Sequence, residues 1–574
     1  MASTSSYFYK NPQHVLDDID IQLTLEPALL KDLTKAFLEE FNLGLGKYNE
    51  PMAMVTEINI CCRPSFVTGV PDGTETGPEQ LVISAGWIGS TFLALDLGGT
   101  NLRVCEVVLN GDKTFKLRQQ KYKVSDQLKT GEASVLFDYL ADSVDAFLTS
   151  HPPDSPGPIL EASLDVLPLG LTFSFPVEQT ALGAGKILTW TKGFAAKNAI
   201  GHDVVKLLQD AFDRKHMHVK CVALVNDTVG ALLSRAYTSG GCILGAIFGT
   251  GTNGAYVEEV AKIKKLANSP AAAKGGYMIV NTEWGAFNNT VIMIQRTHLP
   301  TTPFDNVLDR TSINPRFQAF EKFISGMYLG EVTRNVLLSL IDAAPKPLLF
   351  KGKVTSVVNI QWGLDTSVMS EVEEAWELIS GLEKTKASPD GSDESSEEKE
   401  AGENDAWDGD DRDILPRWEQ LGSKEGLAKL NQKTRDKLER VRRVVVSRLA
   451  YEDDDVSLRD AAIVRWACHL VAHRAALLSG VAVATILIQT GRASFVDADG
   501  HSNGMNGSQK DAGQRINFYP HFERTMRESV RSIIGEEVER RVEIGLARDG
   551  SGVGVLIVLL VFLCHCTAVV LPYK

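Results

Sequence analysis

An acidic residue and two glycines stand close together in the stretch TFLALDLGGTNLRV, which runs from residue 91 to residue 104. Gly98-Gly99 predicts a tight turn whose backbone N–H groups can approach an anionic ligand closely. Asp96 precedes this turn and could hold a hydrated cation, while Thr100-Asn101 adds side-chain donors. The pattern predicts a phosphate and Mg²⁺ site, although an ordinary hairpin between two buried strands has the same pattern.

A second glycine turn occurs in the stretch FGTGTNG, where Thr250-Gly251 separates two further strand-like runs. Its backbone amides could surround phosphate oxygens in the same way as those of the first turn. Each turn alone is a weak signal. Two such turns on two successive strand pairs predict two halves that face one nucleotide across a cleft.

A carboxylate in the stretch LVNDTVGALL has a position suited to proton transfer. Asp227 follows an apolar strand and precedes a helix, where loops at strand ends present side chains to ligands. It could accept a proton from a hydroxyl group held within hydrogen-bonding distance. The alternative interpretation is that Asp227 is the N-cap of the helix.

Hydroxyl, amide and carboxylate side chains alternate with aromatic ones in the stretches LTFSFP, LTWTKGF, NTEWGAF and FEKFISGMYLGE. These stretches contribute Ser174, Thr191, Lys192, Glu283 and Glu321. A sugar hydroxyl both donates and accepts hydrogen bonds, and leaving one unpaired costs about 1–3 kcal/mol. The combination predicts a sugar site, although Glu283 and Glu321 taken singly also suit surface or capping acids.

The elements that must position these residues alternate between strands and helices, which predicts an α/β protein. A helical stripe places Leu136, Leu140, Val144 and Phe147 on one face. We expect strands over 92–97, 103–108 and 115–122, a strand–turn–helix over 219–237 and a strand–turn–strand over 241–259. Helices are expected over 21–45, 434–449 and 458–480, and a buried strand over 481–491.

The 574 residues suffice for two or three domains, and the net charge of −14 is mostly local. Residues 387–413 contain twelve Asp or Glu against one Lys and one Arg, a net charge of −10, so about −4 is left for the rest. This tract predicts a disordered surface loop, with an acidic interaction segment as the alternative. The nearly balanced remainder leads us to expect no nucleic-acid partner.

Cysteine usage and the two ends of the sequence bear on the compartment. The eight cysteines form no regular framework, which is typical of a reducing compartment, and the N-terminal residues contain no apolar signal core. We therefore expect a cytoplasmic protein. The apolar run at 555–574 is a transmembrane candidate, but no basic flank precedes it, so membrane anchoring is not expected. Cys564-His565-Cys566 has no second ligand cluster and is not interpreted as a metal site.

The stretches FLALDLGGTNLRV, LGLTFSFPV, LTWTKGF, VNDTVGALL, GTGTNGAY and VNTEWGAF occur in the order found in eukaryotic hexokinases and most resemble fungal glucokinases. The resemblance runs from about Ile21 to Gly554. It implies an actin-like ATPase (ribonuclease H-like) fold, with a small domain at 18–240 and a large domain at 241–554 around a cleft. It also implies ATP-dependent phosphorylation of glucose at the 6-hydroxyl, the first step of glycolysis, with fructose and mannose as candidate acceptors.

The same resemblance implies a role for individual residues, with ATP and Mg²⁺ as cofactors. Asp227 matches the general base that takes the proton from the sugar 6-hydroxyl. The positions that match sugar contacts are Ser174, Phe175, Thr191, Lys192, Asn226, Asp227, Asn253, Glu283 and Glu321. Those that match nucleotide contacts are Asp96, Leu97, Gly98, Gly99, Thr100, Asn101, Thr250, Gly251, Gly326, Met327, Thr366 and Ser370, with Asp96 near Mg²⁺ through water.

Four features depart from the family's pattern. Residues 56–63 and 78–90 interrupt stretches that the family joins, a Gly-Val-Asp-Gly-Ser turn is missing before Phe518, and the apolar run at 555–574 replaces an alanine-rich final helix. We hypothesise that the two insertions and the apolar run are translated introns or gene-model errors, with genuine surface insertions as the alternative for the first two. The missing turn predicts reduced affinity for ATP. It also makes a catalytically weak, sugar-binding regulator the alternative function.

Overall fold

The computed structural model divides into two compact units. One boundary falls after Thr24, and the other two fall inside the helices α11 (Gly326–Ile341) and α17 (Leu458–Gln489). Unit 1 contains residues up to Thr24 and Gly330–Val471, and unit 2 contains Leu25–Leu329 and the residues from Ala472. The predicted division at 18–240 and 241–554 stays a prediction. The structure describes residues 12–46, 63–65, 67, 92–99, 101–110, 112–151, 166–266, 272–273, 275–288, 298–377, 424–496, 512–516 and 519–546.

Several predicted segments lie outside the described residues. They are the acidic tract 387–413, residues 56–62 and 78–90 of the two insertions, and the apolar run 555–574 with its Cys-His-Cys triplet. The predictions about them therefore stay predictions. Arg63, the last residue of the first insertion, is described and begins the strand β1 (Arg63–Pro64).

Unit 2 contains a five-stranded sheet with two antiparallel and two parallel strand pairs. Its strand order is β4 (Phe115–Lys123), β3 (Asn101–Leu109), β2 (Phe92–Leu97), β5 (Leu167–Phe173) and β8 (Val219–Val225). β2–β3 and β3–β4 are antiparallel, whereas β2–β5 and β5–β8 are parallel. The first three predicted strands are confirmed, with ends that differ by at most two residues.

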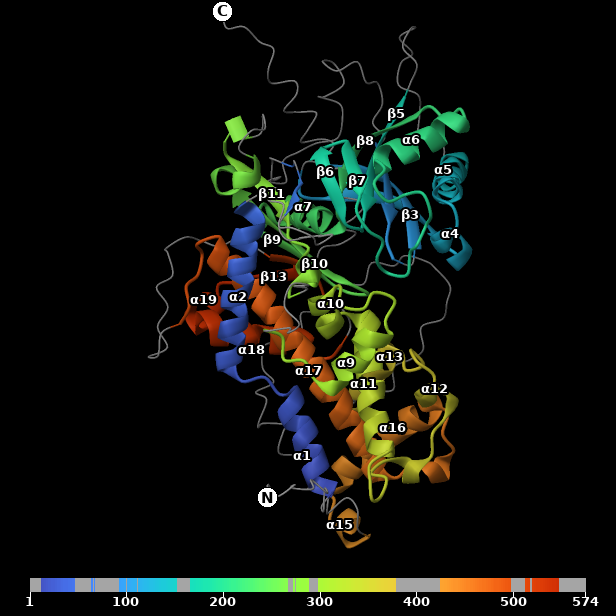
Figure 1. Ribbon diagram of the computed structural model, residues 1–574, viewed down its shortest axis with the longest axis vertical. Coiled ribbons are helices and arrows are strands. Elements are labelled where there is room, and N and C mark those ends of the chain that lie inside the picture. The colour runs from blue at the N-terminus through green and yellow to red at the C-terminus, as the bar shows by residue number, and fades with distance from the viewer. Residues whose placement is uncertain are drawn as a thin grey trace, which may run out of the picture. The chain divides into compact units, whose positions relative to one another are not determined.

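A six-stranded sheet in the same unit repeats this arrangement and adds β1 at one edge. Its order is β1, β11 (Tyr277–Asn281), β10 (Thr252–Glu259), β9 (Leu244–Phe248), β12 (Ala512–Ile516) and β13 (Ile544–Leu546). Its strands β9, β10, β11 and β13 are labelled in Figure 1. β9–β10 and β10–β11 are antiparallel, and β9–β12 and β12–β13 are parallel. The repeated order agrees with the predicted actin-like ATPase (ribonuclease H-like) fold.

Helices cover the five-stranded sheet on both faces (Figure 1). The helices α5 (Ala133–Ser150) and α6 (Val204–Arg214) pack on one face, and all four residues of the predicted stripe on α5 are buried. The helix α7 (Asp227–Ser239) lies in a second core cluster that takes residues from both sheets. Burying apolar residues on both sides of α7 joins the two sheets into one unit.

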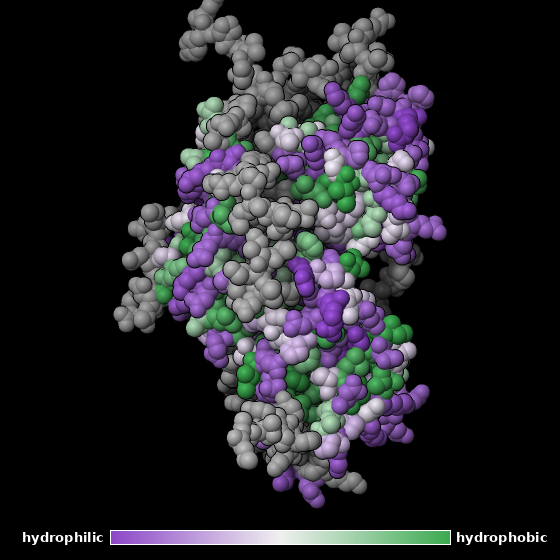
Figure 2. Space-filling model, viewed as in Figure 1, coloured by the Kyte–Doolittle hydropathy of each residue, from purple (hydrophilic) through white to green (hydrophobic). Residues whose placement is uncertain are grey.

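The remaining elements complete the two units. Unit 2 also contains α2 (Pro27–Gly46), α4 (Asp126–Thr130), α9 (Pro303–Thr311), α10 (Ala319–Ile324), α18 (Phe522–Ile534), α19 (Glu536–Glu539), the 3₁₀ helix η4 (Trp284–Ala286) and the hairpin of β6 (Val177–Ala181) and β7 (Ala184–Ile187). Unit 1 contains α1 (Pro12–Leu23), α12 (Ser356–Asn359), α13 (Thr366–Glu377), α15 (Lys424–Ala428) and α16 (Gln432–Leu449). In the view of Figure 2, polar side chains cover most of the described surface, and apolar ones occur in small groups.

Two predictions about secondary structure need correction. The buried strand expected over 481–491 is wrong, because α17 continues to Gln489 as one helix of 32 residues. The helix expected over 21–45 is interrupted after Leu23, and α2 begins at Pro27, since proline suits the first turn of a helix but not its interior. Within the described residues, α17 is also the one helix long and apolar enough to cross a membrane, yet 89% of its most apolar window is buried in the protein.

Candidate active site

The two predicted glycine turns occupy equivalent places in the two sheets. One joins β2 to β3 and the other joins β9 to β10, and these pairs have matching positions in the repeated strand order. Gly98 N donates to Asn101 O at 3.1 Å in one turn, and Gly249 N donates to Gly251 O at 2.9 Å in the other. A Cβ atom on Gly99 would lie 3.1 Å from Lys192 Cβ, and one on Gly251 would lie 3.2 Å from Lys192 Cε. The side chain of Lys192 therefore packs against both turns.

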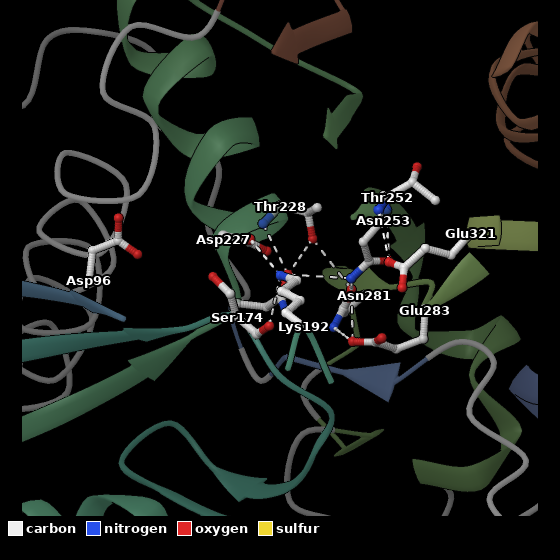
Figure 3. Close-up of polar contacts among 12 residues, drawn as sticks. Asp96, Ser174, Lys192, Asp227, Thr228, Thr252, Asn253, Asn281, Glu283 and Glu321 are labelled. Atoms are coloured by element: carbon white, nitrogen blue, oxygen red, sulfur yellow. Dashed lines mark hydrogen bonds and ion pairs between the residues drawn. The ribbon is translucent and has the colours of Figure 1, made fainter. Parts of the chain in front are cut away.

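The first turn holds most of the residues predicted to bind phosphate. Asp96 lies on β2, is largely buried and faces Arg103 on β3, with 3.7 Å between Arg103 Nη1 and Asp96 Oδ2. Figure 3 shows its carboxylate apart from the cluster around Lys192. Leu97 O accepts a hydrogen bond from Ser174 N, which ties the strand to the sugar residues. Thr100 lies outside the described residues.

The second turn is attached to the start of α11. Gly326 N donates to Gly249 O at 2.7 Å, and Met327 N donates to Thr250 O at 3.3 Å. The structure therefore brings Gly326 and Met327 next to the turn, with both N–H groups bonded to its carbonyls. Thr366 and Ser370 lie on α13 in unit 1, where Thr366 Oγ1 accepts from Gly330 N.

A pocket in unit 2 brings together all nine residues that were predicted to contact the sugar. Figure 3 labels Ser174, Lys192, Asp227, Asn253, Glu283 and Glu321 among them. The nine residues come from the ends of β5, β8 and β11, from the start of β10, from α10 and from the loop that follows β7. Strand ends meet at one edge of a sheet, which explains why residues far apart in the sequence converge. The pocket is also lined by Pro176, Ile247, Gly251, Thr252 and Gln318.

Lys192 and Asp227 face each other in this pocket. Lys192 Nζ donates to Ser174 O at 2.9 Å and lies 3.7 Å from Asp227 Oδ2, and both side chains are 17% exposed. The N-cap of α7 is Asn226, whose Oδ1 accepts from Thr228 N at 3.0 Å. The alternative interpretation of Asp227 as the N-cap is therefore wrong, and its carboxylate is directed to Lys192 instead.

A chain of amides positions Glu283. Asn281 Nδ2 donates to Glu283 Oε1 at 2.6 Å, and Asn281 Oδ1 accepts from Asn253 Nδ2 at 2.8 Å. Asn253 Nδ2 also lies 3.3 Å from Glu283 Oε1. Because Asn253 donates to both partners, its amide orientation is determined by the network rather than by a ligand.

The backbone at Glu283 is strained and is held by the residue that follows. Glu283 has a φ of +52°, which is unfavourable for a residue with a side chain. Trp284 is buried, its Nε1 donates to Thr252 Oγ1 at 3.0 Å, and its ring occupies the space that a side chain at Gly254 would need. Gly254 is therefore required for the close approach of the ring.

Glu321 is the other buried carboxylate of the pocket. Its Oε2 accepts from Thr252 N at 3.0 Å and would collide with a Cβ atom on Gly251. Burial raises the pKa of Glu321 to about 6, and the charge of Glu283 raises it further, while Lys192 and the Thr252 N–H oppose this shift. The carboxylate therefore titrates within two pH units of neutrality.

Sequence reasoning missed several polar residues of this site, among them Asn281, Thr252 and Gln318. Asn281 and Thr252 stand in the quoted stretches NTEWGAF and FGTGTNG, whereas Gln318 lies two residues before the stretch FEKFISGMYLGE. Asn281 is two positions before Glu283 at the end of a strand, and Gln318 is three positions before Glu321, a spacing that places both on one side of a helix start. Thr252 contributes mainly its backbone N–H, which the residue type does not reveal.

Comparisons with known proteins agree over nearly the whole chain. Family models described as hexokinase match residues 15–237, 243–401 and 407–561. A glucokinase of Aspergillus niger is 35% identical over 553 residues, which cover 92% of both chains. Glucokinase-1 of Saccharomyces cerevisiae is 33% identical and covers 95% of this chain and 96% of its own.

A solved structure supports the fold. A hexokinase from Schistosoma mansoni complexed with glucose matches with a TM-score of 0.70 and 28% identity, covering 95% of this chain and 98% of its own. This likeness confirms the predicted fold class, because it includes both sheets and the helices around them. With two family models and two full-length relatives above 30% identity, the chain belongs to the hexokinase family.

Proposed function

We propose that this protein transfers the terminal phosphoryl group of ATP to the 6-hydroxyl of glucose. The observation that carries the proposal is the single pocket in which Asp227, Lys192 and the other predicted sugar residues converge beside the two glycine turns. The relatives named glucokinase and the glucose-bound hexokinase of similar structure support glucose as the acceptor. Fructose and mannose are further acceptors to test.

Asp227 is the group suited to take the proton from the sugar hydroxyl. Its carboxylate projects from the first turn of α7 into the pocket and is 3.7 Å from the Lys192 ammonium. A carboxylate in this position can accept the proton of a hydroxyl group that lies within hydrogen-bonding distance. Lys192 itself is held by Ser174 O and by its packing against the turns, so it stays close to Asp227.

The remaining polar groups suit the other sugar hydroxyls. Asn226 uses its Oδ1 to cap α7, which directs its amide nitrogen away from the helix as a donor. Glu283 and Glu321 are carboxylate acceptors held by Asn281 and by Thr252 N. A pocket with fixed donors and acceptors discriminates against ligands that lack a hydroxyl, because the polar groups would stay unpaired.

MgATP is the second substrate in this proposal, and magnesium would neutralise part of the phosphate charge during transfer. The residues suited to face it are the amides of the two glycine turns and the carboxylate of Asp96. No cluster of three His, Cys, Asp or Glu suited to a metal occurs in the described part of the chain. Asp96 would hold the magnesium of MgATP in place, and phosphate oxygens of the nucleotide are a ligand type that this cation prefers.

A cytoplasmic location is part of the proposal. Cys221 is a buried thiol whose pKa is raised by burial to about 12, so its reactive thiolate form is suppressed. Such a thiol needs no oxidising compartment for folding. Fractionation of cells that express a tagged full-length chain tests this expectation directly.

The test of the function is a coupled assay with glucose and MgATP on the full chain and on Asp227→Ala. We expect the variant to lose about 10²–10⁴-fold in kcat, the range typical of a removed general base, while it still binds glucose. Asp126→Ala is a matched control, because Asp126 also occupies the first position of a helix, after the N-cap Ser125, but outside the pocket.

Undiminished turnover by Asp227→Ala would contradict the assigned base. Glucose binding by the unaltered chain without any turnover would instead select the sugar-binding regulator. Assays with fructose and mannose under the same conditions rank the acceptors.

A further inference from the structure

The residues Gln318 and Glu321 reach the pocket from a segment with unusual backbone geometry. Gln318 is the N-cap of α10 with a φ of +54°, and Arg316, two residues earlier, has a φ of +69°. Neither is a glycine, so each residue carries conformational strain of roughly 1–3 kcal/mol. The segment between α9 and α10 must therefore be held in place by contacts elsewhere.

Apolar burial does not hold this segment. Ile313 is 68% exposed and Phe317 is 42% exposed, so its two large apolar side chains lie at the surface. A segment without buried apolar side chains gains little from the hydrophobic effect. Polar contacts must supply the restraint.

A buried ion pair provides that restraint. Lys322 Nζ donates to Asp309 Oδ1 at 2.8 Å and to Asn314 O at 2.7 Å, and the side chains of Lys322 and Asp309 are 4% and 12% exposed. Arg316 N donates to the same Asp309 carboxylate, at 3.0 Å from Oδ1 and 3.2 Å from Oδ2. Asp309 and Lys322 therefore bind the segment at Asn314 and Arg316 and link α9 to α10.

The ion pair is also directly connected to the sugar pocket. Lys322 follows Glu321 on α10, and Glu321 Oε2 accepts from Thr252 N on the opposite wall of the pocket. Gln318 Oε1 lies 2.6 Å from the place that a Cβ atom on Gly285 would take, so this side chain reaches the backbone beside Glu283 and Trp284. A shift of α10 would move both pocket residues together.

We propose that Asp309 and Lys322 are positioning residues that pre-organise Gln318 and Glu321 for the hydroxyls of the sugar. The inference rests on the proposed function, since it assigns these two residues to the same sugar site. A buried ion pair is weak support for stability alone, because apolar residues of equal volume are often as stable. Here the ion pair selects one conformation of the strained segment, and that conformation determines the selectivity of the pocket for sugars.

The experiment compares the unaltered full-length protein with Asp309→Asn. This change keeps the shape and an acceptor for Arg316 N but removes the charge that faces Lys322. We expect the KM and calorimetric Kd for glucose to rise about 10- to 100-fold, as displacement of a positioned group commonly costs, with the KM for ATP unchanged. The preference for glucose over one or two of its monodeoxy analogues should fall by a similar factor.

Three further variants make the result decisive. Glu539→Gln removes a carboxylate that is 4% exposed and is paired with Arg527 between α18 and α19, and it should leave both sugar constants unchanged. Lys322→Arg keeps the charge and should retain most of the affinity. If Asp309→Asn fails to fold, Lys322→Gln is measured in the same way.

A folded Asp309→Asn or Lys322→Gln variant with unaltered glucose Kd and unaltered selectivity among the deoxy analogues overturns the inference. A fall in kcat alone, without a change in sugar constants, overturns it as well. Failure of the proposed function is seen separately, because the unaltered protein would then bind glucose without turning it over.

Discussion

At the scale of single residues, the site depends on how far each carboxylate is removed from water. Asp227 and Glu321 both lie near Lys192, but Glu321 is buried and shares its surroundings with Glu283. Burial disfavours its charged form and raises the pKa of Glu321 to about 6, well above 4.5, its ordinary value. The titration of Glu321 is thereby brought into the range of mild acidification.

The raised pKa of Glu321 predicts that glucose binding weakens on mild acidification. Below about pH 6, Glu321 is protonated and becomes a weaker acceptor for Thr252 N–H and for a sugar hydroxyl. A charged hydrogen bond exceeds a neutral one by about 1.4 kcal/mol, so the glucose Kd should rise about tenfold between pH 7 and pH 5. Calorimetry at a series of pH values measures this, and Glu321→Gln should show a flat profile.

The same shift has an opposite consequence for stability. A carboxyl whose folded pKa is raised contributes stability below about pH 4.5, and that contribution is lost as the pH rises through about 6. Glu40→Gln is the control for the pH dependence of glucose binding. Burial also raises the pKa of Glu40 to about 7, but Glu40 lines no part of the pocket. If Glu321→Gln keeps the pH dependence of glucose binding, the assignment to Glu321 is wrong.

At the scale of elements, α17 shows why an apolar run does not determine its own conformation. Its last nine residues, VAVATILIQ, are rich in β-branched residues and belong to the run that was predicted as a strand. They are helical because the preceding helix continues into them and because they are buried among other elements, including α18. Gly480 lies at the crossing, where Ser529 Oγ of α18 donates to Leu477 O at 2.7 Å.

Replacing Gly480 with alanine should destabilise the protein. The new Cβ atom would lie 2.5 Å from Met526 O and 2.5 Å from Ser529 Cβ, so α18 would have to move. Overpacking of this kind costs about 1–3 kcal/mol, which exceeds the gain of about 1 kcal/mol in helix propensity. The midpoint of denaturant unfolding should therefore fall.

Gly46→Ala is the matched control for that substitution, since Gly46 also lies in a helix but a Cβ atom there would meet nothing within 4 Å. It should leave the midpoint unchanged or raise it slightly. A Gly480→Ala protein as stable as this control would show that the two helices adjust without cost.

At the scale of the whole molecule, the unit that contains the site is built from two sheets that share a five-strand order, with a glycine turn between β2 and β3 in one and between β9 and β10 in the other. Equivalent turns in two copies explain how two separate stretches of sequence reach one lysine. The two insertions interrupt neither copy: Arg63 pairs with Asn281 at one edge, and β2 begins at Phe92, after the second insertion.

We therefore predict that a chain lacking residues 56–63 and 78–90 folds and turns over glucose at least as fast as the full sequence. Removing the first segment brings Val55 next to Pro64, and a backbone of any residue type can pair with Asn281 in place of Arg63. Coupled assays on both chains measure the effect, and sequencing the transcript shows which chain the cell makes. Loss of activity on deletion would indicate that the segments are genuine parts of the protein.

The sequence alone was enough to predict which residues meet in the pocket. Asp227, Lys192, Glu283 and the glycine turns stand in short stretches where a strand ends and side-chain type matches a task. Strand positions near these motifs were predicted within two residues because the apolar runs there are short and bounded by glycine or by polar residues. These are local properties, and local properties can be read from neighbouring residues.

The tertiary structure decided the features that depend on contacts between residues far apart in the sequence. It placed Lys192 between two turns, joined Asn281 to Asn253 across neighbouring strands, and buried Asp309 against Lys322 beneath a strained segment. It also made residues 481–489 helical and gave Glu321 its raised pKa. The burial of a side chain and the identity of its hydrogen-bond or ion-pair partner are set only when remote segments pack together. A pattern along the chain therefore does not predict them.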